Sequence, residues 1–595
     1  MLKRCGLFFI IVVFLSYFNF AFCSVDLEPI VITKNKVHLL NPYSLESDNL
    51  KNLPSDSFIE SLNILPIDLQ SRSPKSSIQT DFSLRGSTFQ GVLMLIDGQR
   101  INDPQTAHHN SDIPLTEEDI KRIEVIPGVS SSVFGPDAIG GAINIILKKP
   151  QSRKIILKLK GGQYQTGSGL FSISDKIDNL GIRLSLENQE SKGFHYDTDF
   201  KKFTTTLNSS LDLPDGEFDI NWGYQEKEFG AYDFYTPGKG NPSKEWTKTY
   251  LLNTGLNLDK AGLIIKPNFL WRRHYDKFML DKTKPQRGLN HHRTDMYTPN
   301  IYFQNQIKFL GMVGFGFEYG EERINSTNLG KYNRNHWSVF MDDSKDLTPR
   351  VSLGSSFRSD DYDDFGQNYT GSLNFRYKLS KINELRFGIS RSIRIPSFTE
   401  LYYNDAYTLG NADLSSEKSL NYELGYACAK ESLSFGLTFF FRQEEDFIDW
   451  VSRNPVLPDK WKAENITEAE VFGIENYLKW KINDYITLNS NYSYINKRIN
   501  DRGFKYKYSP NYIKHLINNI FSLKLPFGMQ TIGLTYKKKP VRRGWFLLNT
   551  RLSYNLNKTS QFFVEVSNLL NVEYQEIEGI PQPGRWVEAG FRLEW

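Results

Sequence analysis

The chain of 595 residues is poor in cysteine, with three in all. Two of them, Cys5 and Cys23, lie in a leading segment that we expect to be removed, so Cys428 is the only cysteine of the predicted mature chain. A single thiol can form neither an internal disulfide nor a cysteine metal cluster. The stability of the fold must therefore come from its sheets and their packing.

Long apolar runs are equally scarce. The only one, Leu7 to Leu15, follows Lys3 and Arg4 and is too short for a comfortable membrane helix. It predicts a secretory signal peptide over residues 1–23, cleaved after Cys23. Lipidation of Cys23 is the alternative, but Phe22 stands where lipoprotein signals require a small residue.

Neither sign of charge is in large excess. Lys and Arg number 72 against 68 for Asp and Glu, and a net charge of +4 over this length does not suggest a nucleic-acid partner. The Gly-rich stretch 135–141 lacks the Gly-Lys-Ser/Thr of a phosphate loop, and no His-Glu-x-x-His or Gly-x-Ser-x-Gly motif occurs. We therefore expect no enzymatic activity and no cofactor.

What the chain does have is alternation of apolar and polar residues, clearest at its very end. In 585–595 one face of a predicted strand carries Val587, Ala589, Phe591, Leu593 and Trp595. In a soluble protein such an apolar strand would be an exposed edge, whereas closure into a membrane barrel removes the edge. A strand of an ordinary sandwich would give the same local pattern.

The same period of two recurs throughout residues 151–595. It predicts a large antiparallel transmembrane β-barrel of about 22 strands with roughly 20 residues per strand. Aromatic residues at 14% with a mean hydropathy of −0.45 fit a lipid-facing wall around a polar lumen. The fold class is thus mainly β.

Residues 50–150 show another pattern, in which strands and short helices are mixed, and they predict a small α/β domain. Residues 24–49 read as an extended linker. Within the small domain we expect a helix over 57–62 capped by Asp56, a short helical turn over 114–119, and strands at 82–84, 92–96, 123–126 and 142–147.

Several motifs carry a resemblance to a known family. They are Leu84-Arg85-Gly86, Leu95-Ile96-Asp97-Gly98, the run 119–148, Ile395 to Tyr402, Asn568 to Asn571 and Pro583-Gly584-Arg585. Together they resemble the TonB-dependent receptors of the bacterial outer membrane, in which an N-terminal plug domain fills the barrel lumen. Chain length and the loop 97–110 are similar to those of the cobalamin receptor branch.

The resemblance also implies two terminal signals. The linker hexad looks like a TonB box, which would bind TonB in the periplasm by strand addition: Glu28, Pro29, Ile30, Val31, Ile32 and Thr33. The closing strand looks like the mark read by the barrel-assembly machinery, with Phe591, Leu593 and Trp595 as its apolar residues. Alternatively, the hexad is a simple tether or a strand that docks on its own domain.

Ligand-binding residues are expected at the plug apex and in the extracellular loops. The apex candidates are Ser87, Thr88, Phe89, Gln90, Gln105, His108, His109 and Asn110. The loop candidates are Tyr232, Phe234, Tyr235, Trp450 and Trp461, although anchoring in an aromatic girdle or loop packing would leave the same pattern.

Metal binding is left open by the sequence. For His108 and His109 we favour a hydrogen-bonding role over a metal site, because neighbours on a strand point in opposite directions, and His291 and His292 are treated alike. Two acidic clusters could bind calcium or be solvated loop carboxylates: Asp197 and Asp199, and Asp360, Asp361, Asp363 and Asp364. Plug charges such as Arg85 and Arg122 are expected to meet opposite charges on the barrel wall.

The expected function is therefore TonB-dependent import of a scarce extracellular ligand across the outer membrane, with cobalamin as the first candidate. The partners would be TonB, a small-molecule ligand, outer-membrane lipid and the barrel-assembly machinery. A ferric siderophore receptor of the same fold is the alternative. A passive porin would share the barrel but needs neither a plug nor a TonB box.

Overall fold

The computed structural model of the chain describes residues 43–73, 75, 77–128, 134–286, 288–453, 460–499 and 503–595. The predicted signal peptide and the hexad Glu28 to Thr33 lie outside these residues. No helix in the described ranges is long and apolar enough to cross a membrane.

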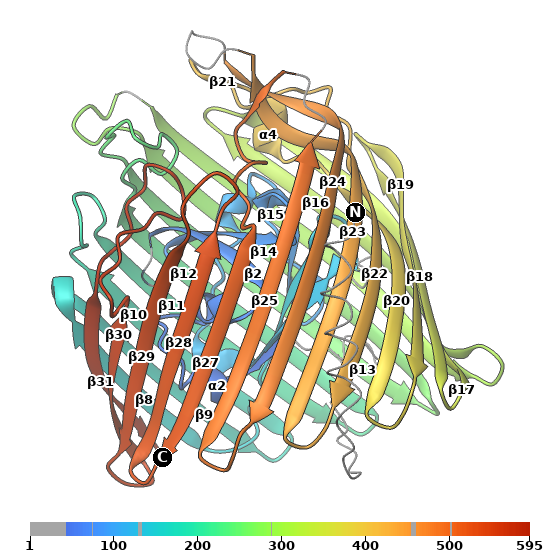
Figure 1. Cartoon of the computed structure of the whole chain (residues 1–595). Coiled ribbons are helices and arrows are strands. Elements are labelled where there is room, and N and C mark those ends of the chain that lie inside the picture. Colours follow the sequence, from blue (N-terminus) through green and yellow to red (C-terminus); the bar gives the residue numbers. More distant parts are fainter. Residues whose placement is uncertain are drawn as a thin grey trace, which may run out of the picture.

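A closed antiparallel barrel makes up most of the chain, and its strands are tilted relative to the barrel axis (Figure 1). Two strands, β21 (Thr408–Leu409) and β26 (Lys505–Tyr506), are only short additions, because β20 pairs directly with β22 and β25 with β27. The wall therefore has 22 strands, as the sequence predicts. The last strand pairs with the first, Phe591 opposite Leu159, which closes the cylinder.

The barrel strands follow one another around the wall in sequence order. They are β8 (Lys154–Gly162), β9 (Thr166–Ile177), β10 (Leu180–Ser191), β11 (Phe200–Leu213), β12 (Gly216–Gly230), β13 (Lys244–Lys260), β14 (Leu263–Met279), β15 (Leu289–Ile307), β16 (Gly311–Ser326), β17 (Gly330–Thr348), β18 (Val351–Tyr362), β19 (Gly366–Lys378), β20 (Asn383–Arg394), β22 (Glu417–Ala429), β23 (Leu433–Ser452), β24 (Trp461–Lys481), β25 (Ile486–Ile499), β27 (His515–Leu525), β28 (Gly528–Lys538), β29 (Trp545–Asn555), β30 (Ser560–Ser567) and β31 (Trp586–Glu594).

The alternation in the sequence sorts side chains between lipid and lumen. On β31 the apolar Phe591 is exposed on the outer face, whereas its neighbours Gly590 and Arg592 are buried towards the lumen. On β11 the lumen side carries Thr204 and Thr206, both fully buried. An apolar exterior around a polar interior is the arrangement expected of an outer-membrane barrel.

The two rims of the barrel differ. One rim carries short turns, such as 178–179 between β9 and β10, and the other carries loops as long as 395–416 and 568–585. Because barrels of this kind have short periplasmic turns and longer extracellular loops, the long-loop rim is the extracellular one. A helix, α4 (Phe398–Tyr402), lies in the first of these loops.

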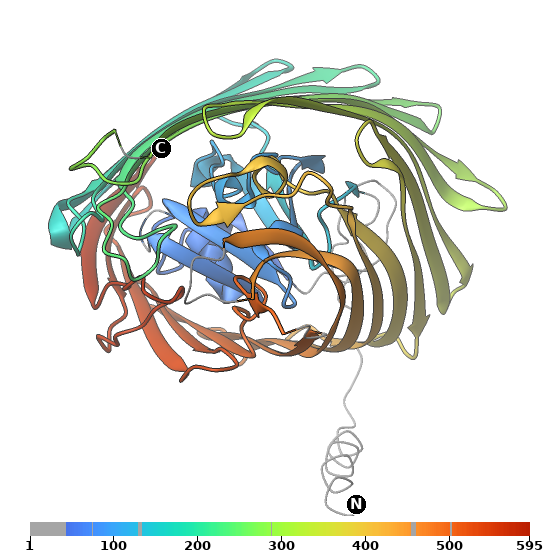
Figure 2. The ribbon, with the colours of Figure 1, turned by 90° about the horizontal axis from the view of Figure 1, so that it is seen from above.

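A separate domain occupies the lumen, as the view along the barrel shows (Figure 2). Its mixed sheet has the order β1-β6-β7-β4-β5, and a two-stranded sheet, β2-β3, lies beside it. The elements are β1 (Ser44–Glu46), α2 (Ser47–Leu50), α3 (Phe58–Ser61), η1 (Leu62–Ile64), β2 (Ile67–Ser73), β3 (Gln79–Leu84), η2 (Phe89–Gly91), β4 (Val92–Ile96), β5 (Gln99–Arg100), η3 (Ala107–His109), η4 (Glu117–Asp119), β6 (Ile120–Pro127) and β7 (Gly141–Leu147). Strand β1 lies in the segment that the sequence assigns to the linker.

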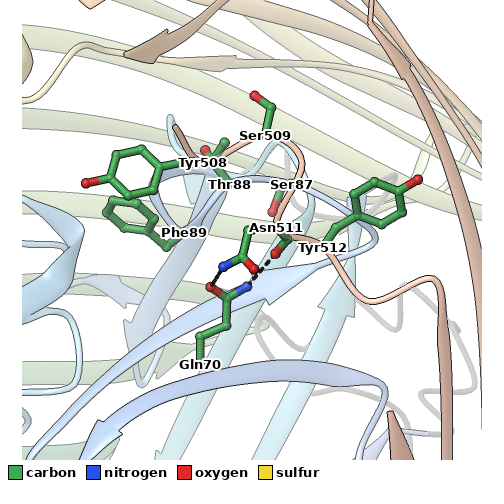
Figure 3. A pocket seen from close by; sticks show the side chains of 8 residues that line it. All are labelled: Gln70, Ser87, Thr88, Phe89, Tyr508, Ser509, Asn511 and Tyr512. Carbon is green, nitrogen blue, oxygen red and sulfur yellow. Dashed lines mark hydrogen bonds between the residues drawn. The ribbon is translucent and has the colours of Figure 1, made fainter. Parts of the chain in front are cut away.

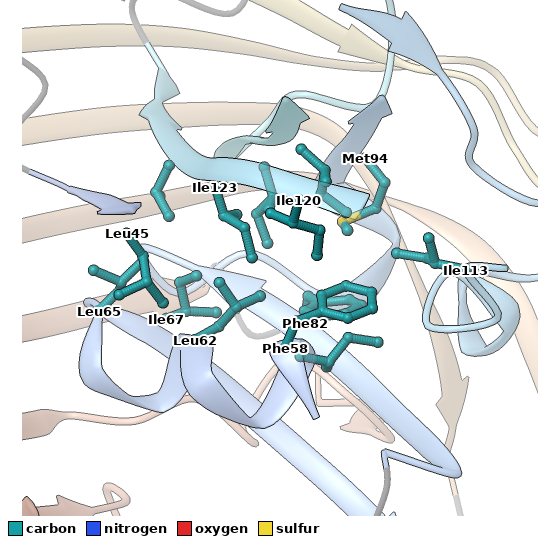
Figure 4. Packing of buried hydrophobic residues seen from close by; sticks show 14 of the residues in the cluster. Leu45, Phe58, Leu62, Leu65, Ile67, Phe82, Met94, Ile113, Ile120 and Ile123 are labelled. Atoms are coloured by element: carbon teal, nitrogen blue, oxygen red, sulfur yellow. The ribbon is translucent and has the colours of Figure 1, made fainter. Parts of the chain in front are cut away.

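The core of this domain lies between its mixed sheet and the α3–η1 segment. Leu62 and Ile67 on one side face Met94, Ile120 and Ile123 on the other (Figure 4). Full burial of each such side chain stabilises the fold by about 1.5–3 kcal/mol. This core stabilises the domain, and it extends to wall residues such as Leu251 and Ile520.

The predicted cap of the first helix is wrong. Ser57 caps α3 and accepts a hydrogen bond from the Glu60 amide, whereas Asp56 lies one residue earlier. The carboxylate of Asp56 instead pairs with Lys75 and Lys160. A helix that begins one residue later leaves this carboxylate free to meet the ammonium groups beside it.

Candidate functional site: the plug apex beneath the extracellular loops

The apex of the plug is built on a tight turn after β3. Arg85 and Gly86 both adopt positive φ values, of 49° and 72°, and the Ser87 amide donates to the Leu84 carbonyl over 2.9 Å. Glycine suits this backbone, and a Cβ at position 86 would also lie 3.0 Å from Ile495. The turn thus brings the segment 87–90 up against the barrel wall.

Arg85 fixes this turn to the wall by charge. Its guanidinium lies 2.7 Å from Glu475 and 2.5 Å from Glu423, on β24 and β22, and it covers the ring of Phe440. The prediction that Arg85 meets opposite charges on the barrel wall agrees with this geometry. Arg122 differs, because it pairs with Glu124 of its own strand over 2.7 Å.

A small pocket lies where the plug apex meets the loop between β25 and β27 (Figure 3). The plug supplies Ser87, Thr88 and Phe89, all predicted ligand residues, together with Gln70 of β2. The loop supplies Tyr508, Ser509, Asn511 and Tyr512. Every side chain of this lining is uncharged, so the pocket offers hydroxyls, amides and rings.

Gln70 and Asn511 hold the two sides of the pocket together. The Asn511 amide donates to the Gln70 side-chain oxygen, and the Gln70 amide donates to the Asn511 backbone carbonyl, both over 2.9 Å. Sequence reasoning missed both residues and the loop 508–512. The aromatic content of that loop was the one available signal, because pairing across 441 positions leaves no local pattern.

Gln90 lines a neighbouring recess rather than this pocket. Its amide donates to Ser397 over 3.3 Å, and its side-chain oxygen accepts from the Ala107 amide. The recess also contains Arg100, Arg334 and Arg394. Each arginine is ion-paired, for example Arg394 with Glu400 of α4 over 2.8 Å.

His108 and His109 point to different surroundings, as predicted, although they lie in η3 rather than on extended chain. The Thr106 side chain caps this turn by accepting from the His108 amide. The His108 ring stacks on Phe89 at 4.2 Å, and its Nδ1 lies 2.8 Å from Asp81. Burial lowers the pKa of His108 to about 4, although the carboxylate of Asp81 opposes this shift.

His109, Gln105 and Asn110 lie in the seam between plug and wall rather than in the pocket. His109 Nε2 is 3.5 Å from Asp276 of β14, and Gln105 donates to the same carboxylate over 3.3 Å. Burial would lower the pKa of His109, but Asp276 and the nearby acids outweigh burial and raise the pKa to about 9. Asn110 accepts a hydrogen bond from the Asp103 amide.

The predicted loop aromatics mostly pack against other loop residues. Phe234 is buried against Phe229, and Trp450 is buried in a cluster with Leu401 against which Trp461 packs. The Tyr232 ring lies 4.9 Å from that of His195. Three of them also approach the plug or its apex: the Tyr235 ring lies 5.7 Å from that of His108, Phe234 clusters with Ile78 of the plug, and Tyr508 of the pocket packs against the Trp450 cluster.

Two of the acidic residues considered for calcium, Asp197 and Asp360, have other partners. Asp197 forms an ion pair with Lys282. Asp360 accepts from Arg358 over 2.8 Å and from Ser338 over 2.5 Å. His291 is exposed, whereas its neighbour His292 is buried towards the lumen.

A cluster of buried charges fixes the opposite side of the plug. Asp56, Glu565 and Glu588 lie close enough together to hold a metal, but the ammonium groups of Lys75 and Lys160 are already among them. Burial raises the pKa of nearby Glu60 to about 8, with Asp56 adding to the shift. A cavity extends from here along β28 and β29, lined by Glu60, Lys537 and Asn549 among others.

A closed barrel with a plug that is ion-paired to its wall beneath extracellular loops defines the class of plugged outer-membrane transport receptors. The family described as TonB-dependent Receptor Plug Domain matches residues 41–142, and the one described as TonB dependent receptor-like, beta-barrel matches residues 160–569. The chain belongs to the TonB-dependent receptors, and its place is the outer membrane.

Individual relatives are distant and differ in what they are named for. The chain is 25% identical over 575 residues to the Iron-regulated outer membrane virulence protein of Vibrio cholerae serotype O1, covering 86% of both proteins. It is 24% identical over 473 residues to the Vitamin B12 transporter BtuB of Photobacterium profundum, covering 75% of both. The siderophore receptor PirA from Pseudomonas aeruginosa shares the fold, with a TM-score of 0.74 at 17% identity over 93% of this chain and 98% of that one.

Proposed function

We propose that this receptor imports cobalamin, using energy that TonB transmits from the inner membrane. The small uncharged pocket of Figure 3, which can take up only a part of the vitamin, carries the proposal. Cobalamin presents amides around the rim of a broad, largely apolar ring system, and the lining offers it the hydroxyls of Thr88 and Tyr508 and the rings of Phe89 and Tyr508. The size of the chain and the similarity to a vitamin B12 transporter also support it.

Energy coupling is proposed to run through the hexad Glu28 to Thr33. The outer membrane has no nucleotide supply and sustains no ion gradient, so uphill uptake must draw on another source. Pro29 disfavours a helix, and the β-branched residues that follow favour a strand that can add to a sheet of TonB. Ligand at the apex would shift the population in which this segment is released to the periplasm.

The coupling is tested by deleting residues 28–33 and, as a matched control, residues 34–39 of the same linker. We expect the first deletion to abolish accumulation of labelled cobalamin in cells while binding to the purified receptor stays unchanged. The control deletion should retain uptake. A strain that lacks residues 28–33 and still accumulates the ligand would refute the coupling.

The ligand site is tested by shortening aromatic side chains of the pocket. Phe89→Ala and Tyr508→Ala should each weaken cobalamin binding at least tenfold, because buried aromatic anchors dominate binding energy. Tyr485→Ala, on an exposed turn at the periplasmic rim, is the control. Equal affinity in all three variants would show that the pocket does not bind the vitamin.

A ferric siderophore is the second candidate. The similarity to an iron-regulated outer-membrane protein favours it. Growth of a knockout strain under limiting cobalamin and under limiting iron separates the two ligands. Swelling of receptor-containing liposomes in sugars without TonB would instead favour a passive porin.

A further inference from the structure

A group of buried histidines and carboxylates joins the plug to the barrel wall outside the ligand pocket. His109 comes from η3 of the plug, Glu245 from β13 and Asp276 from β14. Each offers one ligand atom, and the three atoms lie within 4.8 Å of one another.

Strand register brings the wall residues together. Asp276 pairs with Thr247 on β13, and Glu245 lies two residues further along the same lumen-facing side. On the other side Asp276 is directly opposite His292 of β15. Such direct and diagonal neighbours are within contact distance on one face of a sheet, and His292 Nε2 lies 4.0 Å from Asp276.

The balance of charge at this position is unusual. Two neighbouring acids have cationic partners, since Arg272 lies 2.5 Å from Asp103 and Lys227 lies 2.6 Å from Asp112. Glu245 and Asp276 have no Lys or Arg partner in the ranges that the structure describes, and Glu245 accepts only from Tyr235. A proton on His109 cancels one of these two charges, whereas a divalent cation cancels both.

Three side chains of this cluster also carry a buried polar atom without a hydrogen-bond partner among the described residues. Asp276 Oδ1, His292 Nδ1 and Gln105 Oε1 are buried and have no hydrogen-bond partner in the described part of the chain. Buried polar atoms are normally hydrogen-bonded, so three orphans in one cluster indicate a missing partner. His109, Glu245 and Asp276 are each less than a tenth exposed.

The chemistry of the ligands selects the ion. Imidazole nitrogen combined with carboxylate oxygen suits Zn²⁺, whereas Ca²⁺ and Mg²⁺ prefer oxygen alone. Two ligands at about 2.1 Å in tetrahedral geometry lie about 3.4 Å from each other. The 3.5 Å between His109 Nε2 and Asp276 matches that separation and exceeds an ordinary N–H···O distance.

The neighbouring triad of His109, Asp112 and His274 is less suitable. His274 Nε2 lies at hydrogen-bond distance, 2.8 Å, from Asp112, and Lys227 occupies the other oxygen of this carboxylate. We propose that His109, Glu245 and Asp276 form a zinc site, with His292 beside it, that ties the plug to the barrel wall. The plug can leave this part of the wall only after its bond from His109 to the ion has broken.

Purified receptor in detergent, stripped with chelator and then exposed to Zn²⁺ alone, tests the site. We expect one zinc per chain by elemental analysis after gel filtration, and Co²⁺ in its place should give the absorption of a four-coordinate ion. His109→Gln and Asp276→Asn should each weaken zinc binding more than tenfold. His291→Gln, which changes an exposed histidine of the same strand as His292, should bind like the wild type.

Hydrogen exchange gives a second readout. Zinc should slow exchange of the amides around 105–110 in the wild type and in His291→Gln, and not in Asp276→Asn, which keeps the shape of the side chain. Heat-modifiable migration on gels confirms that each variant barrel is folded. Absence of stoichiometric zinc in the wild type, or unchanged binding in folded His109→Gln and Asp276→Asn, would overturn the proposal.

Discussion

Lys75 of the plug places its ammonium 2.7 Å from Glu588 of β31, the strand that closes the barrel. The same ammonium pairs with Asp56 and lies over the ring of Trp586. One side chain thus connects the plug to the seam of the barrel. The ion pair is buried on both sides, so its loss cannot be compensated by water.

Lys75→Met should loosen the plug, because it leaves Asp56 and Glu588 buried with less compensating charge. The expected loss in free energy of unfolding of the plug is about 3–5 kcal/mol. Limited proteolysis and thermal melts of the purified receptor measure it. Lys239→Met, in an exposed extracellular loop, is the control, and equal melting of both variants would contradict the role of Lys75.

Gly140→Ala should disturb the apex. A Cβ at this position would lie 2.4 Å from the Leu84 carbonyl oxygen and 2.7 Å from the Ser87 hydroxyl, so the turn that carries the pocket must shift. Overpacking of this kind costs about 1–3 kcal/mol. Ligand affinity and plug stability should both fall, whereas Gly167→Ala, where a Cβ meets nothing within 4 Å, should change neither.

The stability of the plug should fall as pH rises. Glu60 is protonated when folded, because burial and then Asp56 raise its pKa from 4.5 to about 8. The stabilisation is therefore complete below about pH 4.5 and is lost as pH rises through about 8. Lys75 and Lys160 face the same group and limit the effect.

Melting temperatures of the plug at pH 5 and pH 8 measure this dependence. Glu60→Gln should flatten it, since a neutral amide replaces the neutral acid. Glu431→Gln, at an exposed turn between β22 and β23, should leave the dependence as in the wild type. A wild-type profile that is flat, or that rises with pH, would contradict the assignment to Glu60.

Phe591→Lys should lower the amount of folded receptor in the outer membrane. Phe591 is half exposed on the outer face of β31, where a charge in lipid costs about 1–4 kcal/mol depending on depth. Leu556→Lys, in a turn at the periplasmic rim, should be tolerated better. The measurement is the amount of heat-modifiable receptor in membrane fractions. Equal amounts of the two variants would contradict a role for Phe591 in the proposed assembly signal.

The alternation of apolar and polar residues predicted the architecture, because successive side chains of a barrel strand face lipid and lumen in turn. Phe591 and Arg592 differ in exposure as their chemistry requires. The count of about 22 strands was taken from plugged outer-membrane transporters, and the chain length is compatible with it. Finer details depend on single backbone angles. Ser57 rather than Asp56 caps α3, a shift of one residue that composition alone does not decide.

The candidate site was predicted only in part, for the same physical reason. Ser87 and Phe89 lie in a motif turn, so their place at the apex follows from the sequence. Asn511 lies in an extracellular loop and Gln70 in the plug. The two residues come into contact only when the plug lies inside the folded barrel. The contact between His109 and Asp276 could not be predicted from the sequence either, since no periodic pattern links the two residues.

The strand nearest the linker is held in the plug by a short ladder. β1 lies at the edge of its sheet and pairs with β6 over three residues, from Ser44 opposite Glu124 to Glu46 opposite Arg122. Tension entering the chain ahead of Tyr43 reaches this short ladder before any other described strand. When the β1–β6 ladder breaks, β6 becomes the edge of the sheet while β4 and β7 remain paired. The plug would therefore unfold strand by strand from the β1 edge rather than all at once.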